Sequence, residues 1–167
     1  MARAYIVMNC KIGSETGIIE SLKQVKGVRE VHGILGLYDL IAQIELESED
    51  AIRDTVTNTI RKIPNIHSTM TLTRSESEGL FQDSEAGDSG NTSKAYLVIH
   101  CNKGDEFSTL KDLCNIPEVK DADVVFGLYD VICKIESSSE DTLQDTILKQ
   151  VRKLPKIKSC MTLNIVN

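Results

Sequence analysis

The sequence predicts an α+β protein built from two tandem βαββαβ repeats. The first observation is an internal repeat with an offset of 91: residues 4–74 align with residues 95–165 without a gap, and 28 of the 71 aligned positions are identical. The second is an order of strand-like and helix-like patterns that is the same in both halves. Such self-similarity indicates a tandem duplication. We predict repeats at 1–74 and 94–167, joined by a flexible, acidic linker at 75–93.

The first half of each repeat reads as strand, helix and hairpin. Residues 4–10 are apolar at nearly every position, and a helix begins near Ser14. Two β-rich runs, at 28–35 and 40–46, flank a Gly-Leu-Tyr-Asp turn, which is a hairpin signal. One face of the predicted helix carries Ile18, Ile19, Leu22 and Val25.

The second half of each repeat reads as helix and strand. Ser48 is a helix N-cap, and Pro64 ends the helix before a last strand at 66–73. Acidic residues in the first turn and basic residues in the last turn suit the helix dipole. The buried stripe is Ile52, Val56, Ile60 and Ile63, matched in the second repeat by Leu143, Ile147, Val151 and Leu154. This order is that of a split βαβ, or ferredoxin-like, unit.

The first strand of each repeat predicts that its sheet is covered on both faces. A sheet covered by helices on one face alone should alternate apolar and polar residues. Tyr5-Ile6-Val7-Met8 and Tyr96-Leu97-Val98-Ile99 do not alternate, so both faces of each sheet are expected to be buried. We predict that the two sheets close into a (pseudo-)dimeric α+β barrel, and pairing with a repeat of another chain is the alternative.

Composition excludes several classes of function. The net charge is −6, but each repeat is nearly neutral and residues 75–93 hold five acidic and no basic residues. Neither repeat has the basic surplus of a nucleic-acid surface, and aromatic residues are scarce at 4%. No apolar run approaches the roughly 18 residues that would span a bilayer, and the start of the sequence lacks the apolar core of a signal peptide. Five irregularly spaced Cys suit a reducing compartment. We expect a cytoplasmic protein that binds neither nucleic acid nor membrane directly.

Together, the Ala-Tyr-Ile-Val strand, the Gly-x-Tyr-Asp hairpin, the helix-ending Pro and the Thr-Met-Thr-Leu strand resemble the ligand-binding (RAM) domain of the leucine-responsive regulatory protein/AsnC family. The resemblance covers both repeats. It implies a non-enzymatic module that senses an amino acid or related metabolite and assembles into homo-oligomers, with four such chains forming a ring. No helix-turn-helix precedes the first strand, so we expect regulation of transcription or metabolism through partners, including a helix-turn-helix relative.

The resemblance also implies the ligand-binding residues. In the family, the hairpin turn and the Ser/Thr residues of the last strand line the effector pocket. Leu37, Leu128 and Cys160 depart from the family's more polar pattern, so the ligand need not be a plain amino acid. The implied positions are Gly36, Leu37, Tyr38, Asp39, Ser68, Thr69 and Thr71 in the first repeat and Gly127, Leu128, Tyr129, Asp130, Ser159, Cys160 and Thr162 in the second.

Each of these sites also has a structural interpretation. The two Asp side chains can stabilise their turns, and the two Tyr side chains can serve in packing alone. His100 and Cys101 are adjacent on a strand and should point to opposite faces, which disfavours a shared metal ion. We therefore predict no metal, no cofactor and buried structural thiols.

Two other functions remain open from the sequence. One is an enzyme of the cofactor-free oxygenase or haem-binding type, because these use similar α+β barrels. The three His (His32, His67 and His100) have no counterpart in the other repeat, which counts against a duplicated catalytic centre. The other is a purely structural assembly subunit.

Overall fold

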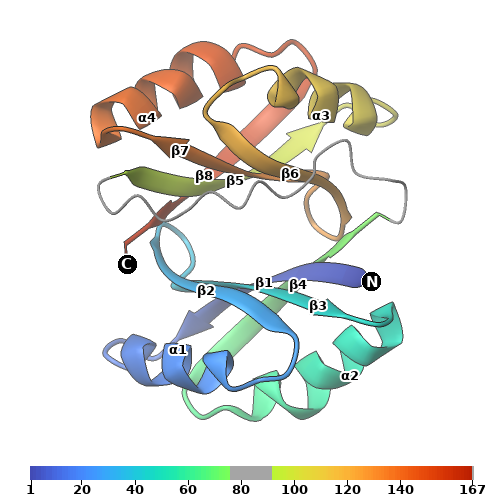
Figure 1. Ribbon diagram of the computed structural model, residues 1–167, viewed down its shortest axis with the longest axis vertical. Helices are drawn as coiled ribbons and strands as arrows, with labels where there is room; N and C mark the ends of the chain where they lie inside the picture. Colours follow the sequence, from blue (N-terminus) through green and yellow to red (C-terminus); the bar gives the residue numbers. More distant parts are fainter. Residues whose placement is uncertain (76–91, 167) are drawn as a thin grey trace. The chain divides into compact units, whose positions relative to one another are not determined.

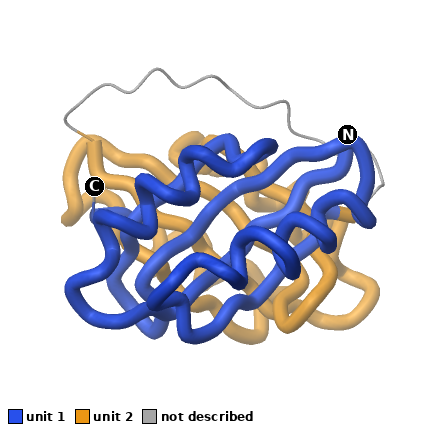
Figure 2. The backbone as a smooth tube through the Cα atoms, turned by 90° about the horizontal axis from the view of Figure 1, so that it is seen from below, with its two compact units in different colours: residues 1–74, 165–167 blue, residues 75–164 orange. Residues whose placement is uncertain are grey.

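The computed structural model describes residues 1–75 and 92–166. The chain divides into two compact units, Met1–Arg74 with Ile165–Asn167, and Ser75–Asn164 (Figure 2). Most of the predicted linker falls on residues 76–91, outside the described part, so the linker stays a prediction.

The first unit is a four-stranded antiparallel sheet with its helices on one face (Figure 1). The strands pair in the order β4-β1-β3-β2, so β1 is central. The elements are β1 (Ala2–Cys10), α1 (Glu15–Lys23), β2 (Val28–Leu35), β3 (Leu40–Leu46), α2 (Glu49–Asn58), the 3₁₀ turn η1 (Ile60–Lys62) and β4 (Ile66–Arg74).

The second unit repeats this arrangement, with its strands in the order β8-β5-β7-β6. Its elements are β5 (Ser93–Cys101), α3 (Glu106–Cys114), β6 (Val119–Phe126), β7 (Val131–Ser137), α4 (Glu140–Thr146), the π-helical turn η2 (Ile147–Val151) and β8 (Ile157–Ile165). The predicted fold class, two βαββαβ units of mixed α+β type, is confirmed.

The predicted caps form at the second helix of each unit. Ser48 Oγ accepts the backbone N–H of Ala51 at 3.1 Å, and Ser139 Oγ accepts that of Thr142 at 3.2 Å. Each cap satisfies one of the N–H groups that the first helical turn leaves unpaired. Ser14 marks the start of α1, as predicted, but its side chain forms no capping hydrogen bond.

The core of each unit lies between its sheet and its helices. In β1, alternate residues Ala4, Ile6 and Met8 pack with α1 and α2, whereas Tyr5 and Val7 point to the other face by strand alternation. Tyr5 and Val7 are also buried, at 2% and 0% exposure. Both faces of the central strand are therefore apolar and buried, as the sequence indicated. The closure of the sheets into a barrel stays a prediction.

The helices of the described residues are too short or too polar to cross a membrane.

Truncating a core leucine should measure the strength of this packing. Leu22 on α1 is fully buried, and Ile12 before the helix is 92% exposed. We expect Leu22→Ala to lower the free energy of unfolding by about 2–5 kcal/mol, because it removes buried methyl groups and leaves a cavity. Ile12→Ala should change it by less than about 0.5 kcal/mol. Urea denaturation of both variants is the measurement, and equal losses would contradict the assigned core.

Candidate functional site

The Asp of the first Gly-Leu-Tyr-Asp turn fastens the hairpin to the end of the central strand. The Asp39 carboxylate accepts the backbone N–H of Cys10 at 2.9 Å. The backbone of Asp39 donates to the carbonyl of Met8 and accepts from the N–H of Ile34, both at 2.9 Å. Gly36 opens the turn at φ 147°, a conformation that side chains rarely adopt. The structural role of Asp39 is thus visible, and its predicted ligand contact stays a prediction.

The second Gly-Leu-Tyr-Asp turn is held by the same set of hydrogen bonds. The Asp130 carboxylate accepts the N–H of Cys101 at 3.1 Å, and its backbone bonds Ile99 and Val125 at 2.9 Å. Gly127 has φ 143°. In both repeats the Asp therefore holds the turn against the end of the central strand.

The Tyr of each turn contacts a Met of the last strand. Tyr38 donates its hydroxyl to Met70 Sδ at 4.0 Å, and Tyr129 donates to Met161 Sδ at 3.8 Å. These contacts agree with the packing interpretation. The turn leucines point outward instead, with Leu37 77% and Leu128 68% exposed.

The second turn carries an imidazole that the first lacks. His100 stacks on the ring of Tyr129 with centroids 4.5 Å apart, and its Nδ1 lies 3.6 Å from Asp130 Oδ2. At the matching position of the first repeat, Asn9 donates to Ser68 Oγ at 3.4 Å. Sequence reasoning set His100 aside because it lacks a counterpart, but the fold places it against a predicted site residue.

The predicted last-strand residues do not share one face. Thr69 and Thr71 pair with Met8 and Ile6 of β1, which face the helices. Ser68 pairs with Asn9 on the opposite face, the face on which Met70 meets Tyr38. The structure therefore separates the turn from Thr69 and Thr71. The same alternation separates Ser159 from Cys160 and Thr162 in β8.

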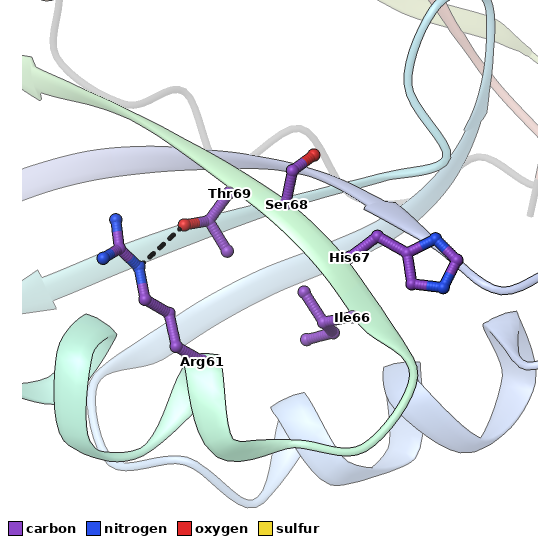
Figure 3. A pocket seen from close by; sticks show the side chains of 5 residues that line it. All are labelled: Arg61, Ile66, His67, Ser68 and Thr69. Carbon is purple, nitrogen blue, oxygen red and sulfur yellow. Dashed lines mark hydrogen bonds between the residues drawn. The ribbon is translucent and has the colours of Figure 1, made fainter.

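A depression of about 420 Å³ lies at the start of β4 (Figure 3). Its lining, which we call the β4 pocket, consists of Arg61, Ile66, His67, Ser68 and Thr69. The volume falls in the range of small-molecule sites. Ser68 and Thr69 were predicted from the resemblance, whereas Arg61 and His67 were missed. The signal that could have found them is a basic residue type at both positions of each repeat, with Arg152 and Lys158 in the second.

Two smaller depressions, of about 200 and 220 Å³, occupy matching places between the second helix and the last strand of each unit. Thr71 lines the first and Thr162 the second, with Arg61 and Arg152 at equivalent positions. None of the three depressions is lined by the turn residues. The predicted site residues are thus distributed between the turns and both faces of the last strands.

The thiols are held as poor nucleophiles. Burial raises the pKa of Cys133, and the neighbouring Cys160 adds to the effect. Burial, with Asp121 nearby, raises the pKa of Cys114 to about 11. Burial also raises the pKa of Cys160, partly offset by the Arg152 guanidinium. Within the described ranges, no three His, Cys, Asp or Glu side chains are grouped to hold a metal ion.

The sequence of each repeat matches the model of the Lrp/AsnC ligand binding domain, at residues 4–77 and 94–167. These segments cover most of the chain, and the protein belongs to this family as a tandem pair of its domains. A search of curated protein sequences finds no match.

Solved structures extend the comparison. The siroheme decarboxylase NirDL has a similar fold over 99% of this chain and 71% of its own, with a TM-score of 0.73 and 8% identity. An anthrone oxidase-like protein matches over 99% of this chain and 91% of its own, with a TM-score of 0.60 and 13% identity. AsnC of E. coli is 24% identical over 53% of this chain and 60% of its own, with a TM-score of 0.46.

Alkylation should show whether the thiols are structural. With its pKa at about 11, Cys114 is ionised in only about one molecule in a thousand at pH 8, because each pH unit below the pKa reduces the thiolate tenfold. We expect iodoacetamide to label Cys114 slowly, and Cys133 only after unfolding in urea, as read by peptide mass spectrometry. The urea-unfolded protein, labelled at all five Cys, is the control. Rapid labelling of Cys133 in the folded protein would refute the structural role.

Proposed function

We propose that this protein is a non-enzymatic module that binds a small metabolite and regulates transcription or metabolism through partner proteins, without contacting DNA itself. The observation that carries the proposal is the β4 pocket. It places the Thr69 hydroxyl beside the Arg61 guanidinium in a depression of small-molecule size. Family membership supports a ligand site in each repeat.

The polar groups around the last strands suit an amino acid or a related metabolite. Hydroxyls can donate to a carboxylate or accept from an ammonium, and a buried polar ligand group needs such partners. Leu37 and Leu128 present apolar surface beside the turn Asp residues. These neighbours suit a ligand with both charged and apolar parts.

Assembly into homo-oligomers is part of the proposal. Both hairpin tips expose an apolar pair, Leu35 with Leu37 in the first unit and Phe126 with Leu128 in the second, each residue at least 62% exposed. Exposed apolar side chains that gather at one place are typical of protein interfaces. A ring of four chains, or a mixed assembly with a helix-turn-helix relative, would cover both tips.

An enzyme is the second candidate, and one observation favours it. His100 Nδ1 faces Asp130 at 3.6 Å, and a carboxylate that orients an imidazole is a recurrent feature of acid–base catalysis. The arrangement is absent from the first repeat, where Asn9 occupies the matching position. Turnover that is lost in His100→Asn, which copies the first repeat, would establish this candidate.

Thermal melting against amino acids, 2-oxo acids and related metabolites tests the proposed function. A ligand that binds only the folded state at a hundredfold excess over Kd adds about 2.7 kcal/mol of stability and raises Tm. We expect a selective rise for one ligand class. If the ligand also contacts the turns, Asp39→Asn with Asp130→Asn should reduce that rise, while the side-chain oxygen still accepts the Cys10 and Cys101 amides and keeps the unliganded Tm.

Light scattering supplies the control for this experiment, since the double variant should keep the oligomeric mass of the wild type. If no compound of the panel raises Tm, the result would argue for a structural assembly subunit. An undiminished shift in the double variant would remove Asp39 and Asp130 from the ligand site.

A further inference from the structure

The segment that joins the second helix to the last strand is basic in both repeats. Residues 59–69 contain Arg61, Lys62 and His67 and no Asp or Glu. Residues 150–160 contain four Lys or Arg and again no acidic residue. The whole chain, in contrast, carries a net charge of −6. Positive charge is thus concentrated where the β4 pocket lies.

Arg61 is held in place by the strand it faces. Its Nε donates to Thr69 Oγ1 at 3.0 Å (Figure 3). In the second repeat, Arg152 reaches the same strand position and donates to the carbonyl of Cys160 at 3.3 Å. Among the described residues, no carboxylate forms an ion pair with Arg61. Its guanidinium is therefore oriented, while its terminal amino groups remain available to a ligand.

A β-bulge places a histidine in the lining of the pocket. In the pairing of β1 with β4, Asn9 lies opposite Ser68 and Cys10 opposite Ile66, so His67 is the extra residue. In the second repeat, the same register shift leaves Lys158 as the extra residue. Bulges redirect side chains and are frequent beside functional sites. Both His67 and Lys158 are exposed.

The helix dipole does not account for this arrangement. Cations at a helix C-terminus are favourable, which explains Arg61 and Lys62. His67 lies on a strand, and the hydrogen bond from Arg61 to Thr69 turns the guanidinium toward that strand and the pocket.

We propose that the β4 pocket binds the oxyanion of a small molecule, a carboxylate or a phosphate, with Arg61 as its main anchor and the neighbouring Thr69 hydroxyl as a further donor. This rests on the proposed function and adds to it the charge of the ligand and the anchoring residue. A guanidinium offers paired N–H donors that match an oxyanion, and such charge-assisted bonds are stronger than neutral ones.

Methyl NMR of the full chain can locate the ligand. With Ile, Leu and Thr methyl groups labelled, Ile66 and Thr69 report on the β4 pocket and Leu37 reports on the turn. The probes are acetate, the common amino acids, their 2-oxo acids, the methyl esters of the same amino acids, and inorganic phosphate. We expect at least one carboxylate or phosphate to shift Ile66 and Thr69, and the ester counterpart that lacks the carboxylate, where one exists, to leave them unmoved. Comparing the shifts caused by the amino acids with those caused by phosphate identifies whether the pocket prefers a carboxylate or a phosphate.

Variants of Arg61 test whether this residue anchors the oxyanion. Arg61→Gln should weaken the binding of the oxyanion about tenfold or more, because it removes charge-assisted hydrogen bonds. Arg61→Lys should restore part of the affinity. Lys62→Gln removes the same charge from a neighbouring exposed residue that does not line the pocket, and it should change the affinity less than twofold.

Three results would overturn the inference. Shifts at Leu37 without shifts at Ile66 and Thr69 would leave the proposed function intact and place the ligand at the turn. Equal affinity of Arg61→Gln and wild type, or equal binding of the esters, would show that the pocket does not select an anion. No methyl shift with any probe would contradict the inference and the proposed function together.

Discussion

The end of the central strand is the point on which the turn and the β4 pocket both depend. Beyond the last pairing of β1 with β3, the Cys10 amide donates to the carboxylate of Asp39, which fixes the hairpin turn. At the same place the register with β4 shifts and His67 becomes the extra residue. A single irregularity thus positions the turn on one side of β1 and His67 on the other.

The second repeat retains this arrangement with different side chains. Cys101, Asp130 and Lys158 stand where Cys10, Asp39 and His67 stand, and the same bonds and register shift form. Some of the substitutions between the repeats lie around the strand end: His100 stands at the position of Asn9, and Cys160 at that of Thr69. Because the scaffold is kept while the surrounding chemistry differs, the two units offer related sites that are not equivalent.

The local pattern of the sequence predicted the helices and strands, but it did not predict which residues line the pocket. The runs at 28–35 and 40–46 were predicted with the bounds that β2 and β3 have, because apolar strands on either side of a Gly turn leave little freedom. The resemblance named Ser68, Thr69 and Thr71, but strand alternation sends them to two faces. A bulge changes one residue of register and leaves no periodic signal, so His67 was not expected in the pocket. Arg61 already had an explanation in the helix dipole.

The amount of positive charge favours a small ligand. A nucleic-acid surface neutralises many phosphates at once, and its affinity comes from the counterions that they release. Each repeat is nearly neutral, and Arg61 is the one Lys or Arg side chain that lines the β4 pocket. A guanidinium with a neighbouring hydroxyl is enough for one oxyanion, whereas a nearly neutral repeat lacks the basic surplus that a polyanion requires. An arginine in a pocket of small-molecule size therefore favours a small anion over a larger one.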